Sequence, residues 1–235
     1  MPHRSTHAKA DRLGGDGPQA VSAMNKADEC LGFAEDERRI ASYFDERARR
    51  FGDDPRALDW SSRTAQQARF RVLSEIGIET GHSVLDVGCG QGDFCLWLQE
   101  NGIRVDYVGL DLSEQMLTVA RAKVPHARLF KGSVCDLEAE LGRFDWVVAS
   151  GIFYLRQCEP YESMRSTVSS MFALADRGVA FNTLADWGGG TTENAEFRAI
   201  PTKVLELCRS STPYVLMRAD YHVADITLYL FKECR

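Results

Sequence analysis

Apolar positions recur at helical spacing in two segments near the start of the chain. The first stripe begins at Ile40 and is followed by Gly52, and glycine often ends a helix. The second begins after Ser61 or Ser62, either of which can cap a helix, and it fades near Gly77. The sequence therefore predicts two amphipathic helices before residue 80.

From residue 82 the pattern changes to short apolar runs that alternate with helical stretches. Five runs are expected to be strands, at residues 82–88, 105–111, 127–131, 144–150 and 178–184. Helices are expected between them at residues 94–100, 114–123 and 161–175. This alternation implies right-handed crossovers and a parallel sheet that helices cover on both faces.

The C-terminal part departs from this alternation. A helix that begins at Pro201 is followed by two apolar runs, at residues 213–221 and 225–232. Their short connection leaves no room for a crossover, so these two strands must be antiparallel. We therefore expect an α/β fold: a Rossmann-like, doubly wound sheet of seven strands, mostly parallel, with an antiparallel strand near the C-terminus and an N-terminal helical cap.

Length and composition indicate one domain with appendages. The chain has 235 residues, enough for one sizeable core. Residues 1–25 are rich in glycine, proline and charge, which predicts a flexible tail, and Met24 is a candidate start of the protein. Residues 26–80 are expected to form the helical cap of the same domain, and residues 81–235 its core.

The charge indicates which class of binding partner to expect, and the cysteines indicate the cellular compartment. The net charge of -6 gives no electrostatic surface for nucleic acid or an anionic membrane, so a small molecule or a protein is the expected partner. The seven cysteines show no zinc-ligand spacing, which indicates reduced thiols and no metal site. Without an apolar stretch of about 20 residues or a signal peptide, the protein is expected in the cytoplasm.

The stretch "VLDVGCGQG" has the features of a ligand site. It places Asp86 at the end of the first strand and then Gly88, Gly90 and Gly92 in the turn. In doubly wound sheets ligands bind at the carboxyl end of such a strand, against the N-terminus of the next helix. A dinucleotide fingerprint would have a third glycine where Asp93 stands, and an acid there would repel a diphosphate, so a nicotinamide-dependent oxidoreductase is disfavoured.

A second acid, Asp111, ends the next strand about twenty residues past the turn, where related sites place the carboxylate that binds ribose hydroxyls. Its alternative role is to cap the helix that starts near Ser113. Asp86, beside the turn, favours a cationic or hydrogen-bond-donating group. Together these residues predict a nucleoside with a positively charged, amino-acid-like tail and no phosphate.

Four motifs resemble those of the class I S-adenosylmethionine-dependent methyltransferases, namely "VLDVGCGQG", "VGLDLSEQML", "GSVCDL" and "FDWVVASGIFYL". The resemblance extends from about Ile40 to the C-terminus. It implies that S-adenosylmethionine is the cofactor. The cofactor residues that it implies are Tyr43, Asp86, Gly88, Cys89, Gly90, Gly92, Asp111, Leu112, Met116, Ser133, Val134, Ser150 and Gly151.

The resemblance also assigns a part of the cofactor to most of these residues. Gly88, Cys89 and Gly90 would line the methionine portion, with Asp86 behind it. Asp111 would bind the ribose, Leu112 and Met116 would contact the sugar and adenine, and Ser150 and Gly151 would lie between the methionine chain and the acceptor. Ser133 stands where many members carry an acid that faces adenine, so the adenine amino group would be met by backbone or by Asp136. Tyr43 would either fold over the cofactor or pack in the core beside Phe44.

Methyl transfer by in-line displacement needs mainly orientation, without a metal or a covalent nucleophile. A general base is needed only when the acceptor arrives protonated. The one candidate is His222, although a histidine in a turn is commonly solvated.

Acceptor residues are expected outside the cofactor motifs, and the candidates are Trp60, Arg63, Phe153, Tyr154, Arg156 and Asn182. Arg63 and Arg156 would either receive an acidic acceptor or serve as surface charges, and Trp60 would contact the acceptor or plug the space under the cap. The sequence "ASGIFY" replaces the N-P-P-Y type motif of enzymes that methylate base or amide nitrogens. We therefore expect methylation of oxygen or nitrogen in a small, partly apolar metabolite. The alternative is an S-adenosylmethionine-binding regulatory or scaffold module without turnover.

Overall fold

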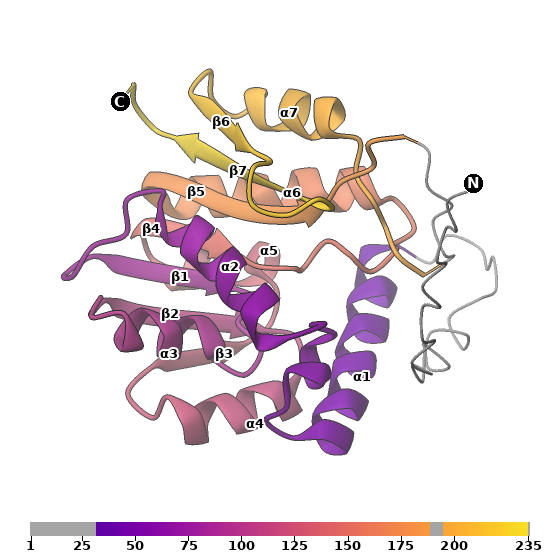
Figure 1. Cartoon of the computed structure of the whole chain (residues 1–235), viewed down its shortest axis with the longest axis vertical. Helices are drawn as coiled ribbons and strands as arrows, with labels where there is room; N and C mark the ends of the chain where they lie inside the picture. The colour runs from indigo at the N-terminus through magenta and orange to yellow at the C-terminus, as the bar shows by residue number, and fades with distance from the viewer. Residues whose placement is uncertain (1–31, 189–194, 235) are drawn as a thin grey trace, which may run out of the picture.

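The short apolar runs form one seven-stranded sheet in the order β3-β2-β1-β4-β5-β7-β6 (Figure 1). The computed structural model describes residues 32–188 and 195–234. The strands are β1 (Ser83–Val87), β2 (Asp106–Asp111), β3 (Arg128–Lys131), β4 (Phe144–Ala149), β5 (Ala175–Leu184), β6 (Val215–Arg218) and β7 (Asp225–Phe231). This confirms the predicted number and sequence of strands.

The direction of each strand agrees with the prediction. β1 pairs in parallel with β2 and β4, β2 with β3, and β4 with β5. β7 is antiparallel to both β5 and β6, so it is the inserted antiparallel strand. Strand order reverses beside β1, because the chain first builds toward β3 and then returns to β4. The carboxyl ends of β1, β2 and β4 therefore meet at one edge of the sheet, where a ligand is expected.

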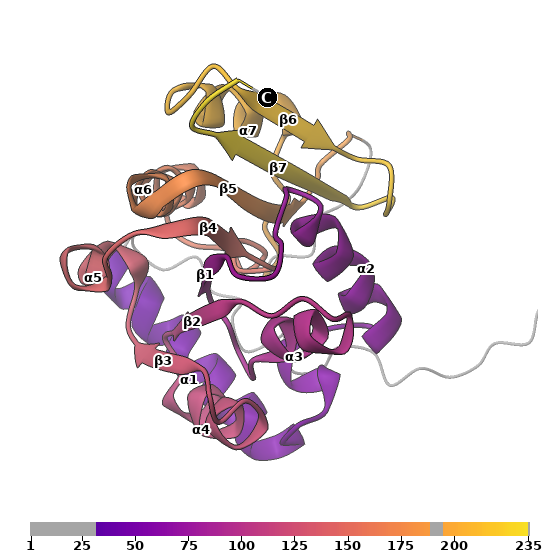
Figure 2. The ribbon, with the colours of Figure 1, turned by 90° about the vertical axis from the view of Figure 1, so that its left-hand side faces the viewer.

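Helices cover both faces of the sheet (Figure 2). Side chains of α2 (Arg63–Ser74), α3 (Asp93–Glu100) and α4 (Glu114–Lys123) share one buried apolar cluster with the strands. Those of α5 (Val134–Leu141), α6 (Pro160–Leu174) and α7 (Pro201–Arg209) share the other. The sheet is thus buried on both sides, as continuous apolar strands require.

The helix boundaries follow local capping signals. α1 (Phe33–Phe51) ends at Gly52, which has a φ of 56°. Ser62, rather than Ser61, caps α2 by accepting a hydrogen bond from the Ala65 N–H at 3.1 Å. Two elements were not predicted: α5 and the short 3₁₀ helix η2 (Pro55–Leu58). η2 has only four residues, too few to produce a periodic pattern.

The cap helix α1 stands across the ends of the strands (Figure 1) rather than on a face of the sheet. The Asp45 carboxylate accepts hydrogen bonds from the Ser113 hydroxyl at 2.6 Å and from the Gln115 N–H at 3.2 Å, which fixes α1 to the start of α4. Phe44 and Leu58 pack with the buried Met116 at the same place.

The division into cap and core stays a prediction. The predicted tail at 1–25, with Met24, lies outside the described residues.

One expectation about the cysteines is wrong. Five described cysteines carry free thiols, whereas Cys158 is disulfide-bonded, because spacing along the chain does not reveal which cysteines meet in the fold. None of the helices in residues 32–188 and 195–234 is long and apolar enough to cross a membrane. Among the same residues, no group of three or more histidine, cysteine or acidic side chains is arranged to hold a metal ion.

Candidate functional site

A cavity lies at the carboxyl ends of β1, β2 and β4, between these strand ends and the cap. Many residues predicted for the cofactor line it, namely Asp86, Gly88, Cys89, Gly90, Asp111, Leu112, Met116, Ser133, Val134, Ser150 and Gly151. Three residues predicted for the acceptor line it too: Trp60, Phe153 and Tyr154. Motifs that are far apart in the sequence therefore converge on one site.

The glycine turn can form only without side chains at two positions. Gly88 and Gly90 have φ values of 72° and 53°, in the left-handed region that favours glycine. A Cβ at Gly88 would lie 2.2 Å from Cγ2 of Ile152, and one at Gly90 would lie 2.8 Å from Leu58. Gly92 does not line the cavity; it precedes α3 and packs on Val124. The first two glycines thus allow Ile152 and Leu58, which also line the cavity, to pack against the turn, while the third allows helices to pack closely.

Asp86 and Asp111 are two acids without an ion-pair partner among the described residues. Asp86 accepts a hydrogen bond from the Tyr107 hydroxyl at 2.5 Å, and burial, with smaller effects of Asp111 and Asp93, raises its pKa to about 7. Burial also raises the pKa of Asp111 to about 6, although N–H groups of Gly90 and Ser113 donate to it at 2.8 Å. A cation or hydrogen-bond donors in the cavity would stabilise both ionised carboxylates.

Asp93 has a different role from the one expected. Its carboxylate lies 2.6 Å from the Lys123 ammonium and accepts a hydrogen bond from the Gln66 amide at 2.9 Å. Lys123 therefore offsets the charge that was expected to repel a diphosphate. The glycine spacing and Asp86 remain as the arguments against a dinucleotide.

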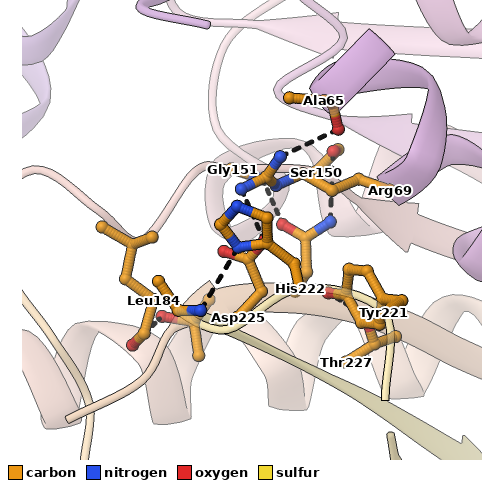
Figure 3. A network of polar contacts seen from close by, with 12 residues as sticks. Ala65, Arg69, Ser150, Gly151, Leu184, Tyr221, His222, Asp225 and Thr227 are labelled. Atoms are coloured by element: carbon orange, nitrogen blue, oxygen red, sulfur yellow. Dashed lines mark hydrogen bonds and ion pairs between the residues drawn. The ribbon is translucent and has the colours of Figure 1, made fainter. Parts of the chain in front are cut away.

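Asn182 does not line the cavity but supports its wall. Its side-chain oxygen accepts a hydrogen bond from the Gly151 N–H at 2.8 Å, and its amide donates to the Ser150 hydroxyl at 3.2 Å. On the other side, the Trp60 ring lies 3.1 Å from where a Cβ of Gly151 would stand, and the Arg69 guanidinium lies 4.8 Å from the centre of that ring. Figure 3 shows the hydrogen bonds that Ser150 and Gly151 make here. Asn182 therefore fixes the end of β4 at the cavity wall.

The aromatic that α1 adds to the cavity is Phe44, not Tyr43. The Tyr43 hydroxyl donates to the Asp59 carboxylate at 2.6 Å, and the Tyr154 hydroxyl donates to the same oxygen at 2.5 Å. The Tyr43 ring packs edge-on against Phe44, with ring centres 5.3 Å apart. Tyr43 thus ties the cap to the loop after β4, which corresponds to the structural alternative considered for it.

Three charged candidates lie outside the cavity lining. Arg63 is exposed at the start of α2, and the Arg156 guanidinium donates to the Glu196 carbonyl at 3.0 Å. His222 lies between β6 and β7, with Nδ1 3.0 Å from the Asp225 carboxylate (Figure 3). Their roles toward an acceptor stay predictions that the cavity does not support.

Sequence reasoning missed lining residues on the cap, α2, α3 and α6, whose apolar members fit an amphipathic pattern and therefore resemble core residues. It also missed positions inside the quoted motifs, such as Val87, Gly132 and Ile152. The lining residues not predicted for the site are Glu37, Ile40, Phe44, Leu58, Gln66, Phe70, Val87, Asp93, Phe94, Gly132, Ile152, Gln157, Ser163 and Thr167.

Comparisons with known proteins agree with this geometry. Residues 84–173 match the family model described as a methyltransferase domain. A Mycobacterium tuberculosis protein named as a methyltransferase is 29% identical over 160 residues, which cover 64% of this chain and 93% of that one. A demethylmenaquinone methyltransferase of Staphylococcus aureus is 34% identical over 97 residues, and this match spans only 39% of the enzyme.

Among solved structures, magnesium protoporphyrin IX methyltransferase of Synechocystis PCC 6803 with bound S-adenosylhomocysteine superposes with a TM-score of 0.61. The two chains are 16% identical, and the match covers 84% of this chain and 100% of the other, which shows a shared fold. The family model covers β1 to α6, where the glycine turn and both buried acids stand. Residues 84–173 thus match a methyltransferase domain, and the chain has the class I fold of S-adenosylmethionine-dependent methyltransferases.

Proposed function

We propose that this protein methylates an oxygen or nitrogen atom of a small, partly apolar metabolite. The observation that carries the proposal is one cavity with two kinds of wall. Glycine backbone and buried acids form the wall at the ends of β1 and β2, and Trp60, Phe153 and Tyr154 form an aromatic wall at the end of β4 and under the cap. The first suits a charged nucleoside, and the second suits a flat or apolar acceptor.

The chemistry of the donor wall fits S-adenosylmethionine. Asp111 would accept hydrogen bonds from the ribose hydroxyls, and Asp86 would face the positive amino-acid end. Leu112, Met116 and Val134 would enclose the base. The fit rests on two buried carboxyls, whose pKa values are raised, and on a turn without Cβ atoms at Gly88 and Gly90, where Ile152 and Leu58 of the cavity wall pack directly.

When bound, the cofactor would supply a methyl group on a sulfonium. A lone pair of the acceptor would form the new bond to the methyl carbon, in line with the carbon–sulfur bond, and the sulfur would leave with that bond's electrons as S-adenosylhomocysteine. The protein then contributes mainly by holding the acceptor in that line. Asn182 holds the Gly151 N–H and the Ser150 hydroxyl, and Trp60 lies against Gly151, so the end of β4 would present a rigid surface to both ligands.

No side chain is assigned as general base. The phenol of Tyr154 lies in the cavity wall, but burial and the neighbouring Asp59 raise its pKa well above the usual value, so it remains protonated and donates to Asp59. His222 is not among the residues that line the cavity. An acceptor that arrives as a neutral amine or an ionised oxygen needs no base.

Calorimetry with S-adenosylmethionine and S-adenosylhomocysteine is the first test, and binding of both is expected. Transfer of a labelled methyl group should then be measured over a panel of phenols, carboxylic acids and amines. An Asp111→Leu variant, which lacks the proposed ribose contact, should give no labelled product. Absence of binding to either ligand would refute the proposal, and tight binding without transfer to any acceptor would favour the regulatory or scaffold alternative.

The affinity for S-adenosylmethionine is expected to rise with pH and to level off above about pH 7. The pKa values of Asp111, about 6, and of Asp86, about 7, mean that both carboxyls become ionised over this interval, and a cationic ligand favours the ionised forms. Binding at pH 6 should therefore release protons, which calorimetry in two buffers of different ionisation enthalpy detects. An Asp86→Asn variant should lose the upper part of the pH dependence. An affinity that is constant from pH 5.5 to 8 would contradict this assignment.

In the protein without ligand, the same two acids make the fold less stable as the pH rises, whereas they make ligand binding tighter. Their pKa values in the folded chain lie above the ordinary value of 3.8, so the protonated forms favour folding. This contribution is fully present below that value and is lost as the pH rises through 6 and 7. Thermal unfolding should show that S-adenosylmethionine raises the melting temperature more at pH 8 than at pH 5.5.

A further inference from the structure

Glu37 places a third carboxyl group in the cavity, although no motif pointed to it. It lies on α1, close to the Ser133 side chain at the start of α5. Partial burial raises its pKa, the hydroxyl of Ser133 lowers it, and the nearby Asp136 raises it. This carboxyl would therefore gain from a hydrogen-bond donor that enters the cavity.

The walls around Glu37 suit a flat aromatic ring. Ile40 is one turn further along α1, while Met116 and Val134 face the same cavity and are almost fully buried. These side chains form apolar faces, and Glu37 and Ser133 are polar groups at the edge. An apolar slot with a carboxylate at its edge fits a heteroaromatic ring that carries an amino group.

Asp136, one of the two acceptors expected for the adenine amino group, bonds to Ser133 and does not face the cavity. Its carboxylate accepts a hydrogen bond from the Ser133 hydroxyl at 2.9 Å, and its own N–H donates back to Ser133 at 3.3 Å. Asp136 is exposed and does not line the cavity. The loop after β3 therefore contributes the Ser133 hydroxyl, rather than a carboxylate, to the part of the cavity beside Glu37.

The backbone that carries Glu37 is fixed on both sides. The Asp36 carboxylate accepts a hydrogen bond from the Cys158 N–H at 2.8 Å, and the Arg39 guanidinium donates to the Arg156 carbonyl at 2.7 Å. Both bonds fasten the first turns of α1 to the loop that follows β4. Glu37 is thus held at the cavity by its neighbours.

We propose that Glu37 accepts a hydrogen bond from the exocyclic amino group of the cofactor's adenine. The cap helix, rather than the loop after β3, then distinguishes adenine from other bases. A carboxylate can only accept hydrogen bonds, so it attracts the amino group of adenine and repels the oxygen that hypoxanthine carries at the same position. This inference rests on the proposed binding of S-adenosylmethionine.

The test compares S-adenosylhomocysteine with its analogue in which hypoxanthine replaces adenine, and both are titrated by calorimetry. The wild type should bind the adenine ligand about 10- to 100-fold more tightly, the range expected for one hydrogen bond to a charged group. In Glu37→Gln the preference should fall to about threefold or less, because an amide can present either an oxygen or an N–H group. Glu46→Gln, an exposed position on the same helix, should keep the wild-type preference.

The outcomes separate this inference from the function on which it rests. A Glu37→Gln variant that binds the adenine ligand with the full wild-type preference would overturn the role of Glu37 and leave the proposed function intact. A wild type that binds neither ligand would overturn both. Improved binding of the hypoxanthine ligand by Glu37→Gln would support the proposal and show that the variant is folded.

Discussion

Replacing Gly88 with alanine is expected to weaken the binding of S-adenosylhomocysteine by about 10- to 100-fold, because one extra methyl group in a filled space costs about 1–3 kcal/mol. The Cβ would lie 2.2 Å from Cγ2 of Ile152. Ile152 can avoid it only by turning into the cavity or by moving the loop after β4. Either change alters the space beside Asp86, where the amino-acid end of the ligand is proposed to bind. Calorimetry on the purified variant measures the loss.

Gly102 provides a matched control for the backbone strain. Its φ of 78° is close to the 72° of Gly88, but no heavy atom lies within 4 Å of a Cβ built there, and Gly102 is outside the cavity lining. Gly102→Ala should therefore lose about 1–2 kcal/mol of stability through the left-handed conformation and keep full affinity. Equal losses of affinity in the two variants would contradict a ligand site at the glycine turn.

The residues at strand ends were predictable because topology alone brings them together. Asp86 and Asp111 end neighbouring parallel strands, and the register that pairs Asp86 with Gly109 fixes their relative positions. Ser113 and Gly52 could be read from capping preferences, which depend only on local backbone geometry. Two rules therefore predict this part of the fold and of the site: local capping preferences, and the meeting of parallel strand ends at one edge of the sheet.

The contribution of the cap could not be derived in the same way. Tyr43 and Phe44 are adjacent on α1, and helical periodicity places both near the buried side, so the sequence does not decide which ring faces a ligand. The structure directs Tyr43 to Asp59 and Phe44 to the cavity. Likewise, Glu37 stands in the charged run of residues 35–39, a pattern typical of a helix surface that faces solvent. Only the docking of α1 on the sheet edge brings it to the cavity.

The pairing of Arg69 with Asp225 also joins distant parts of the chain, so the sequence does not predict it. No local pattern relates a residue of α2 to the first residue of β7. Yet Nη2 of Arg69 lies 2.5 Å from Oδ2 of Asp225, and both side chains are buried (Figure 3). The Arg69 guanidinium also donates to the Ala65 carbonyl at 2.8 Å and lies over the Trp60 ring. One cation thus connects the cap, the sheet and the cavity wall.

Replacing Arg69 with methionine is therefore expected to lower the free energy of unfolding by about 3–5 kcal/mol, the usual cost of removing one partner from a buried ion pair. Methionine preserves much of the apolar stem but leaves the Asp225 carboxylate, which is 2% exposed, without its guanidinium. The only other ion-pair partner of Asp225 in the described part of the chain is His222, which is itself partly exposed. Urea denaturation of the variant and the wild type measures the difference.

Two further variants test whether charge, rather than shape, causes the loss. Arg71→Met removes an exposed arginine from the same helix and should change the stability by no more than about 0.5 kcal/mol. Arg69→Met combined with Asp225→Leu removes both charges and should regain most of the stability, because a buried pair is often replaceable by apolar side chains. If Arg69→Met were as stable as Arg71→Met, the pair would not be buried as the structure places it. If the double variant stayed as unstable as Arg69→Met, the packing of the guanidinium against Trp60 would matter more than its charge.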